Sequence, residues 1–390
     1  MRTTLRSNHS LTSMLHFLLM LTMTPAFQPR SFSRYKRDQF ISVATSSEQS
    51  LGTMKFDQAA WERGYTSCNE EVVKELEGSL PTDIEGTFFK NVPAKFEYGK
   101  DLVLHPFDAD GLVLGITIKD GKALFRNRFV RTKGYVADSK RNRIVSRGTF
   151  GTRKSGFLAN LFDFKFKNTA NTNVLYWDKK LFALQESDIP HYMEPDSLRT
   201  MGKYRFRGLL KSSVNCFTAH PRIDSRTGYL VAFSLKSGKI PTELTMYEFD
   251  PSLKVVTSRD VKFKDFCFYH DFVVTDNYYV FVQAPASFDV MVGVVFFLTS
   301  ADLVNLFQKM IFGQKSPGQC VSFDSSRPSL VHIIPREPSK ESQTIEIPTQ
   351  FLFHCANAYE EDGQIVMGND KSRTIIIHCD CFFSRHCRVG

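Results

Sequence analysis

Beyond residue 50 the chain consists mostly of short apolar runs of strand length, separated by polar turn residues. Examples of the runs are ALFRNRFVRT, GYLVAFSL, LTMYEFD, YYVFVQAP and SLVHIIPRE. Between them the turn signals NVP, DADG, IKDG, WDKK, DSRTG, TDN and EDG recur at short, fairly even spacing. Short apolar runs bounded by Gly, Pro, Asn and Asp are typical of strands. The pattern predicts an all-β sandwich, barrel or propeller, and it does not choose among them because no sequence repeat is visible.

Helical periodicity is sparse. The best candidates for helices are residues 159–165 (ANLFDFK) and 300–312 (SADLVNLFQKMIF). The uncharged run VMVGVVFFLTSA, at 290–301, is too short to span a bilayer. Together with the second candidate helix, it predicts either a peripheral membrane contact through 290–312 or a buried strand followed by a core helix.

Composition adds two constraints to this picture. The chain of 390 residues contains 36 Phe and only 2 Trp, which predicts a large aromatic interior or a tunnel for an apolar ligand. The net charge of +9 is concentrated at the N-terminus, because residues 1–37 hold six basic residues and no acidic ones. The remainder is almost neutral, so the charge does not support nucleic-acid binding.

The N-terminal residues have the composition of targeting signals. Residues 1–26 place two arginines before an apolar run and end in a small residue, which predicts a signal peptide. Residues 27–50 open with FQPRSFSRYKR, which is rich in Ser and Arg and is typical of a transit peptide. The junction at Phe27 resembles the bipartite signal of algae with secondary plastids. We therefore expect a plastid (chloroplast) location, with secretion or an endomembrane location as the alternative.

The eight cysteines do not form a disulfide framework. Five of them, Cys68, Cys216, Cys267, Cys320 and Cys355, lie far apart and are expected to be buried thiols in a reducing compartment. The other three lie within residues 379–387, in the segment HCDCFFSRHC. That segment is either a soft-metal site, such as one for zinc, or a chance cluster without a partner knuckle.

Three histidines share one setting, which is an apolar or aromatic lead-in of strand type. They are His220 in CFTAHPRID, His270 in FCFYHDFVV and His354 in FLFHCANAYEEDG. For His354, residues 351–353 predict a buried strand that ends at the imidazole, and residues 360–363 predict the turn that follows. Strand ends from separate sheets can converge, and imidazole suits Fe, Zn, Cu and Ni. By spacing alone, the three are either a metal centre or unrelated buried histidines.

Other polar residues have less distinctive settings. Glu186 follows an apolar run in KLFALQESDIPH, so it either holds the second nitrogen of a metal-bound imidazole or is a solvated loop residue. His105 lies in HPFDADG, where Asp108, Asp110 and Gly111 are expected to supply turn chemistry. His191, in IPHYMEP, is expected in a surface loop.

Seven ordered segments resemble the carotenoid cleavage oxygenases, non-haem iron enzymes that include the plant epoxycarotenoid dioxygenases. From about residue 84 to about 367 they are IEGTFFKNVPA, HPFDADGLVLGITIKDGKALFRNRFVRTKGY, NTNVLYWDKKLFALQE, FTAHPRID, HDFVVTDNYYVF, VHIIPRE and FHCANAYEEDG. The resemblance implies an all-β fold, a seven-bladed β-propeller with a helical cap, formed here by residues 51–367. It also implies that His220, His270 and His354 are iron ligands and that Glu186 hydrogen-bonds a ligand imidazole, which we expect to be His270.

The C-terminal sequence no longer resembles the family after the segment IVMG. The family takes a fourth histidine ligand and two more carboxylates from a longer C-terminal part, so we expect the C-terminal blades to be missing in this chain. Residues 368–390 form an atypical tail rich in Cys and His, and its His378 and His386 do not sit in the family's context.

The resemblance implies an Fe(II) dioxygenase that uses O2 to cleave a conjugated double bond of a carotenoid or apocarotenoid into two carbonyl products. The chain has no Ser/His/Asp or paired-carboxylate signature, which fits chemistry carried by a metal. One alternative is a carotenoid- or lipid-binding protein of the same fold, inactive for lack of the fourth ligand. Another is an isomerohydrolase of the family, which moves a polyene ester without O2.

Overall fold

The fold is seen in a computed structural model. It describes residues 71–369, except 157, 212–214, 237–241 and 289–311, together with the backbone of 374–378. The chain divides into two compact units, Met1–Asp57 and Gln58–Gly390, and every described residue belongs to the second. The predicted targeting segments (1–26 and 27–50), residues 290–311 of the predicted membrane contact and most of the tail lie outside the described residues.

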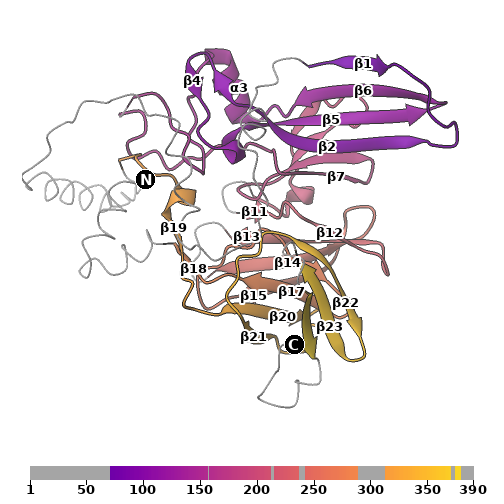
Figure 1. The fold of residues 1–390 in the computed structure, drawn as a ribbon, viewed down its shortest axis with the longest axis vertical. Helices are drawn as coiled ribbons and strands as arrows, with labels where there is room; N and C mark the ends of the chain where they lie inside the picture. The colour runs from indigo at the N-terminus through magenta and orange to yellow at the C-terminus, as the bar shows by residue number, and fades with distance from the viewer. Residues whose placement is uncertain are drawn as a thin grey trace, which may run out of the picture. The chain divides into compact units, whose positions relative to one another are not determined.

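Antiparallel sheets make up almost all of the regular secondary structure in the described residues (Figure 1). In sheet order, the first holds β1 (Val73–Leu76), β6 (Lys122–Phe129), β5 (Asp110–Lys119) and β2 (Gly86–Lys95), and the second holds β10 (Thr200–Lys203), β9 (His191–Met193), β8 (Lys180–Leu184) and β7 (Asn173–Trp177). The third holds β11 (Asn215–Phe217) and β12 (Arg222–Asp224), both paired with β13 (Tyr229–Lys236), then β14 (Glu243–Phe249) and β15 (Val255–Lys262). The fourth holds β16 (Val273–Val274), β17 (Tyr278–Gln283), β20 (Ser329–Pro335) and β21 (Gln343–Ile347), and the fifth holds β22 (Cys355–Glu361), β23 (Gln364–Asn369) and β24 (Thr374–His378).

The smaller elements are two short hairpins and a few helical turns. They are β3 (Glu97–Tyr98) with β4 (Asp101–Leu102), β18 (Ala286–Phe288) with β19 (Val321–Phe323), the helix α3 (Lys133–Arg141), and the 3₁₀ turns η2 (Pro106–Asp108), η3 (Phe206–Gly208) and η4 (Pro317–Cys320). The predicted all-β class is therefore confirmed, and α3 is the one α-helix of the described residues. The number of blades and the closure of a ring stay predictions from the family resemblance.

Turn chemistry explains why strands end where they do. The hairpins β5–β6, β7–β8 and β22–β23 turn at Asp120–Gly121, Asp178–Lys179 and Asp362–Gly363, and all six residues have positive φ. Two-residue hairpin turns of type I′ need positive φ at both positions, and Asp and Gly adopt it most readily. The sequence signals IKDG, WDKK and EDG thus mark real hairpins.

The apolar core lies in layers between successive sheets. Phe182, Phe217 and Phe249, from the second and third sheets, share one cluster. Phe233 and Phe281 belong to a second cluster, between the third and fourth sheets. Side chains of β17, β20, β22 and β23 form the next layer. Much of the high Phe content is therefore used in packing sheet against sheet, and this packing holds the strand ends that carry the site.

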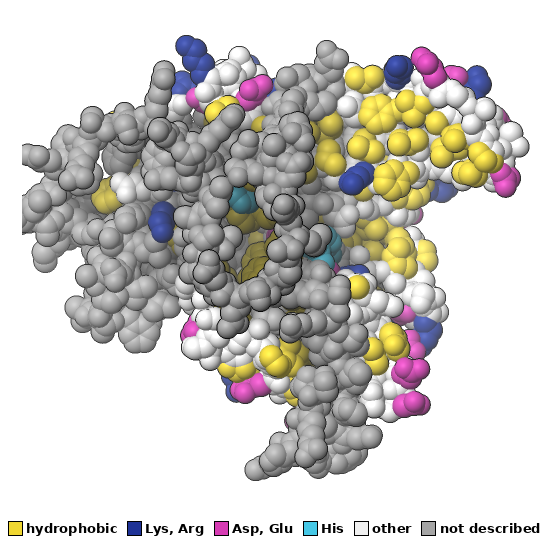
Figure 2. Space-filling model, in the orientation of Figure 1, with side chains coloured by type: hydrophobic (Ala, Val, Ile, Leu, Met, Phe, Trp, Pro, Cys, Tyr) yellow, Lys and Arg dark blue, Asp and Glu magenta, His cyan; other side chains and the backbone are white. Residues whose placement is uncertain are grey.

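One face of the first sheet carries exposed apolar side chains. Leu76 and Phe88 are 40% and 59% exposed, and the strand register places both on the face that also holds Ile116 and Phe125. Figure 2 shows hydrophobic side chains gathered over this sheet. The opposite face, which holds Phe89, packs against the second sheet.

Two local predictions were wrong. Residues 159–165 form turns and irregular chain in place of a helix, because Asn160 bonds the backbone of Lys154 and Gly156 and Phe162 has positive φ. The strand expected before His354 begins only after it, at Cys355, and runs through Glu361. Within the described part of the chain, no helix has the length and apolar character needed to cross a membrane.

Candidate metal centre

Three histidines come together from three different sheets. His220 lies in the break between β11 and β12, two short strands that pair with different stretches of β13. Thr218 opens this break by donating its backbone N–H to Phe233 O, and its side chain accepts from His220 N. His270 lies three residues before β16, and His354 lies directly before β22. His270 and His354 therefore sit where strands begin, not where strands end as the sequence pattern suggested, and His220 lies between the end of one strand and the start of the next.

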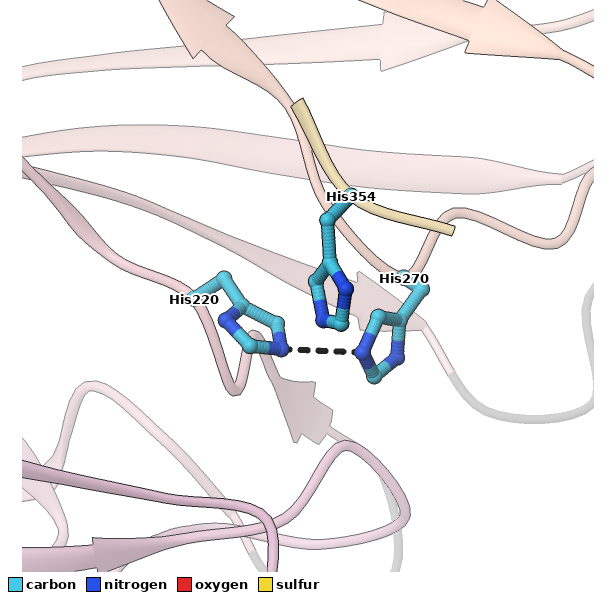
Figure 3. A group of neighbouring side chains, drawn as sticks. All are labelled: His220, His270 and His354. Carbon is cyan, nitrogen blue, oxygen red and sulfur yellow. Dashed lines mark hydrogen bonds between the residues drawn. The ribbon is translucent and has the colours of Figure 1, made fainter. Parts of the chain in front are cut away.

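The three rings face one common point (Figure 3). One ligand atom from each lies within 4.8 Å of the others, and the Nε2 atoms of His220 and His270 are 2.9 Å apart. The ring of His354 is 5.0 Å from each of the other two, centroid to centroid. Two nitrogens bound to one metal at about 2.1 Å and about 90° lie about 3.0 Å apart. The observed nitrogen spacing fits such a metal.

Glu186 fixes the orientation of one ring. Its Oε1 lies 2.9 Å from His270 Nδ1, so the carboxylate accepts that N–H and leaves Nε2 for the common point. Burial raises the pKa of the Glu186 carboxyl, but the hydrogen bond and the charge interaction with His270 outweigh burial, so the pKa lies below its usual value. The hydrogen bond expected between Glu186 and His270 is thus present.

The electrostatic setting keeps an imidazole neutral. Burial, and to a lesser extent the neighbouring His270, lowers the pKa of His220 to about 4. A neutral imidazole keeps a lone pair for a metal at physiological pH. In the described residues these three histidines are the only such group of possible metal ligands, and imidazole nitrogen suits iron, zinc, copper and nickel.

An aromatic surface adjoins the rings. Phe353 stacks on His270 with the ring centroids 4.0 Å apart, and it stacks on Phe107 at 6.1 Å. Phe351 and Phe323 continue this row, and Phe107, Phe323 and Phe351 are each more than 40% exposed. We call these four residues the aromatic face. The aromatic face was not predicted from the sequence, because Phe351 and Phe353 looked like a buried strand and because Phe107 is brought there from a distant segment.

Three expectations about other polar residues were wrong. His191 lies in β9 and is only 3% exposed, because the second sheet packs around it. Asp108 and Asp110 are buried too. Asp108 accepts the backbone N–H groups of Phe150 and Thr152, and Asp110 accepts from Lys167.

Gly111 and His105 also differ from the simple turn expected for HPFDADG. Gly111 lies in β5, where a Cβ would come within 2.2 Å of Ala170 O, so close backbone approach requires glycine. His105 caps η2 by accepting from Phe107 N. It is not part of the three-histidine group, in agreement with the sequence analysis.

Sequence comparison places this site in a family. A sequence model described as retinal pigment epithelial membrane protein matches residues 65–384, a longer range than the seven segments that carry the resemblance. The chain is 36% identical over 318 residues to apocarotenoid-15,15′-oxygenase of Synechocystis, covering 79% of this chain and 61% of that protein. It is 32% identical over 292 residues to carotenoid cleavage oxygenase 1 of Neurospora crassa, covering 74% of this chain and 50% of that protein.

A solved structure shows the same fold. The crystal structure of the cobalt-substituted Synechocystis oxygenase superposes with a TM-score of 0.74 and 32% identity, covering 85% of this chain and 72% of that chain. This chain spans only about half to three-fifths of the length of the two relatives named above. The matched sequence, the all-β fold and the three-histidine centre together establish that the chain belongs to the carotenoid cleavage oxygenase family, whose sequence model bears the name of the retinal pigment epithelial membrane protein.

Proposed function

We propose that this protein is a non-haem iron dioxygenase that cleaves a conjugated double bond of a carotenoid or apocarotenoid. The observation that carries the proposal is the convergence of His220, His270 and His354, with Glu186 behind His270. The substrate class is supported by the relatives, which are named as an apocarotenoid oxygenase and a carotenoid cleavage oxygenase. Cleavage of one C=C bond by one O2 gives two carbonyl fragments, so the reaction balances without another reductant.

The donor set suits Fe(II). Three neutral nitrogens bind a divalent metal without the negative charge that carboxylate or thiolate ligands would add. A bound Fe(II) would supply the site at which O2 is activated beside the substrate. His220, His270 and His354 would hold the ion, and Glu186 would keep the ring of His270 in the tautomer that offers Nε2.

The aromatic face supplies a place for the polyene. Its exposed rings offer apolar area next to the imidazoles, and Phe353 touches both His270 and Phe107. An extended conjugated chain laid along this face would lose water-exposed apolar surface and would place one bond near the metal. The protein's contribution is therefore to bind, orient and exclude water, and no side chain is needed as nucleophile or general acid.

The decisive test uses labelled oxygen. The full chain is loaded with Fe(II) and given an apocarotenoid, a carotenoid and a polyene ester in separate assays under ¹⁸O2, and the products are identified by mass spectrometry. The proposal predicts one aldehyde or ketone at each side of the cleaved bond, with ¹⁸O from O2 in the carbonyls. Iron binding with isomerised polyene and no ¹⁸O would instead indicate an isomerohydrolase. Carotenoid binding without iron would indicate a binding protein.

We further propose a plastid location, supported by the composition of residues 1–50. A fluorescent fusion of residues 1–50, expressed in an alga with a secondary plastid, should accumulate in the plastid. A fusion with Phe27→Ala tests the proposed junction and should stay outside it. Secretion of the unaltered fusion would contradict the proposal.

A further inference from the structure

The three strands that follow the histidines are not hydrogen-bonded to one another as a sheet. β12, β16 and β22 each pair within their own sheet, although β12 contacts β16 and β16 contacts β22. A metal site tolerates errors of only about 0.2 Å in its bond lengths. Contacts other than sheet pairing therefore have to hold the segments around His220, His270 and His354, here called the three histidine segments, at fixed positions relative to one another.

Arg222 crosses between all three segments. It lies two residues after His220, and its Nη2 donates to Asp271 Oδ2 (2.6 Å) and to Cys355 O (2.8 Å). Its Nε donates to Phe272 O at 3.0 Å. Asp271 directly follows His270 and Cys355 directly follows His354, so this one guanidinium is bonded to the neighbours of both other histidines.

Asp271 completes the connection. Its carboxylate is only 3% exposed and accepts from three donors: Arg222 Nη2, Cys355 N at 3.0 Å and Phe272 N at 2.8 Å. The bond to Cys355 N joins the His270 segment to the His354 segment directly. Arg222 and Asp271 thus link the three histidine segments pairwise.

The chemistry of these groups suits a positioning role. A guanidinium is a rigid planar fork with several donors, whereas a lysine ammonium is a flexible point charge. Hydrogen bonds to ionised partners are also shorter and stronger than neutral ones. The hydrogen bonds of the Arg222 and Asp271 side chains go to each other and to backbone atoms of Phe272 and Cys355, so both would act through backbone placement and not as ligands.

We propose that Arg222 and Asp271 are positioning residues of the metal centre and form a brace that sets the spacing of His220, His270 and His354. This inference rests on the metal site of the proposed function. Glu186 orients one ring by a direct hydrogen bond. Arg222 and Asp271 would instead fix the relative positions of the backbone segments that carry the three rings.

The chain contains a matched control for the brace. Arg226 and Asp276 form an ion pair at 3.4 Å between the same two sheets, and Arg226 Nη2 also donates to Asp276 O. Both side chains are more than half exposed, and the contacts of this pair join Arg226 and Asp276 to each other, away from the residues beside the three histidines. Equivalent substitutions at the two pairs therefore separate the brace from a general Arg–Asp contact.

The test measures cobalt binding to the metal-free full chain, by chelator competition, by the visible absorption of bound Co(II) and by the rise in Tm on Co(II) addition. Arg222→Lys and Asp271→Asn should each raise the Kd for Co(II) by about 10–100-fold, change the absorption bands and reduce the Tm rise. Arg226→Lys and Asp276→Asn should leave all three unchanged.

The outcomes distinguish the brace from the metal site itself. If Arg222→Lys lowers the Tm of the metal-free protein but keeps the wild-type Kd and absorption bands, the pair is merely structural and the brace is overturned. If Arg222→Lys does not fold, Asp271→Asn decides by the same readouts. If the wild-type chain itself binds no Co(II), the proposed function fails and the brace falls with it.

Discussion

Two polar clusters of this protein treat their polar groups in opposite ways: one is fully buried and ionic, and the other extends from the buried His270 to the exposed His354. The ionic cluster consists of Lys167, Asp110, Asp138 and Tyr98, and the imidazole cluster consists of His220, His270 and His354. Lys167 Nζ lies 2.5 Å from Asp110 and 2.7 Å from Asp138, and all three side chains are at most 4% exposed. Burial opposes the charge on Lys167, but the two carboxylates outweigh it and raise the pKa of Lys167 above its usual value.

The imidazole cluster has no such internal balance. Its rings point nitrogen atoms at one another, and the carboxylate of Glu186 lies behind one ring, away from the common point. A cation at that point would satisfy the nitrogen lone pairs that the chain aims there. The comparison teaches that burial of polar groups alone does not identify a site. The ionic cluster pairs its buried cation with two carboxylates of the same chain, whereas the imidazole cluster is arranged for a ligand.

The largest expected effect comes from removing one ring of the imidazole cluster. His270→Asn should reduce metal affinity by more than about 100-fold, beyond the effect of losing an outer partner, and should abolish cleavage. The fold should persist, because Asn can still bond Glu186. Iron content, measured by mass spectrometry, tests the loss of the metal. Circular dichroism tests whether the fold persists. Stoichiometric iron in the variant would mean that His270 is not a ligand.

Breaking the ionic cluster should affect stability and not metal binding. Lys167→Met leaves two buried carboxylates without their cation, which should cost about 3–5 kcal/mol of unfolding free energy. The exposed pair Lys122–Glu75 is the control, and Lys122→Met should cost less than about 1 kcal/mol. A lower unfolding free energy of Lys167→Met in urea, with its Co(II) affinity unchanged, would confirm that the ionic cluster affects stability and not metal binding. A loss of Co(II) affinity in folded Lys167→Met protein would refute it.

His191 is a buried imidazole outside both clusters, and it should make stability depend on pH. Burial, with a smaller contribution from Lys203, lowers its pKa from 6.5 to about 4. Because the folded-state pKa is the lower one, the unfolded chain takes up the proton first as pH falls. Stability is therefore complete above about pH 6.5 and is lost toward pH 4, by up to about 3 kcal/mol.

The variant His191→Phe isolates this contribution. The difference in unfolding free energy between the variant and the wild type should shift in favour of the variant as the pH is lowered from 7 to 4, and it should be constant above pH 7. Denaturant titrations at several pH values measure the difference. A difference that does not change with pH would show that His191 has the same pKa in the folded and unfolded chains.

The smallest of the expected effects is the loss of metal affinity when the charge of Glu186 is removed. Glu186→Gln keeps an acceptor for His270 Nδ1 but removes the negative charge, so metal affinity should fall by about 10–100-fold while the fold persists. Glu360→Gln is a suitable control, because Glu360 bonds Asn277 and not an imidazole. Chelator competition with Co(II) compares the two variants. Equal affinities would show that the charge behind His270 does not matter.

Local sequence determined the strands, several turns and the identity of the candidate ligands. Asp-Gly pairs adopt positive φ by their own backbone preference, so the hairpins at IKDG and EDG could be located without a structure, and WDKK was located as the polar break between two apolar runs. His220, His270, His354 and Glu186 could be proposed as one set because each lies in a distinctive short segment. Their convergence was an inference from family resemblance, since no local spacing implies it.

Tertiary structure alone decided which polar groups are buried and what they touch. Asp110 looked like a turn residue, yet it is buried because Lys167, 57 positions later, supplies a counter-charge. Arg222 looked like an ordinary residue after His220 until Asp271 and Cys355 were placed beside it. A residue's φ preference and hydrophobic period act over a few neighbours, whereas burial and hydrogen-bond partners depend on segments that are distant in the chain. The sequence by itself therefore determined the elements and the candidate chemistry, and only packing between sheets brought the three imidazoles to one point.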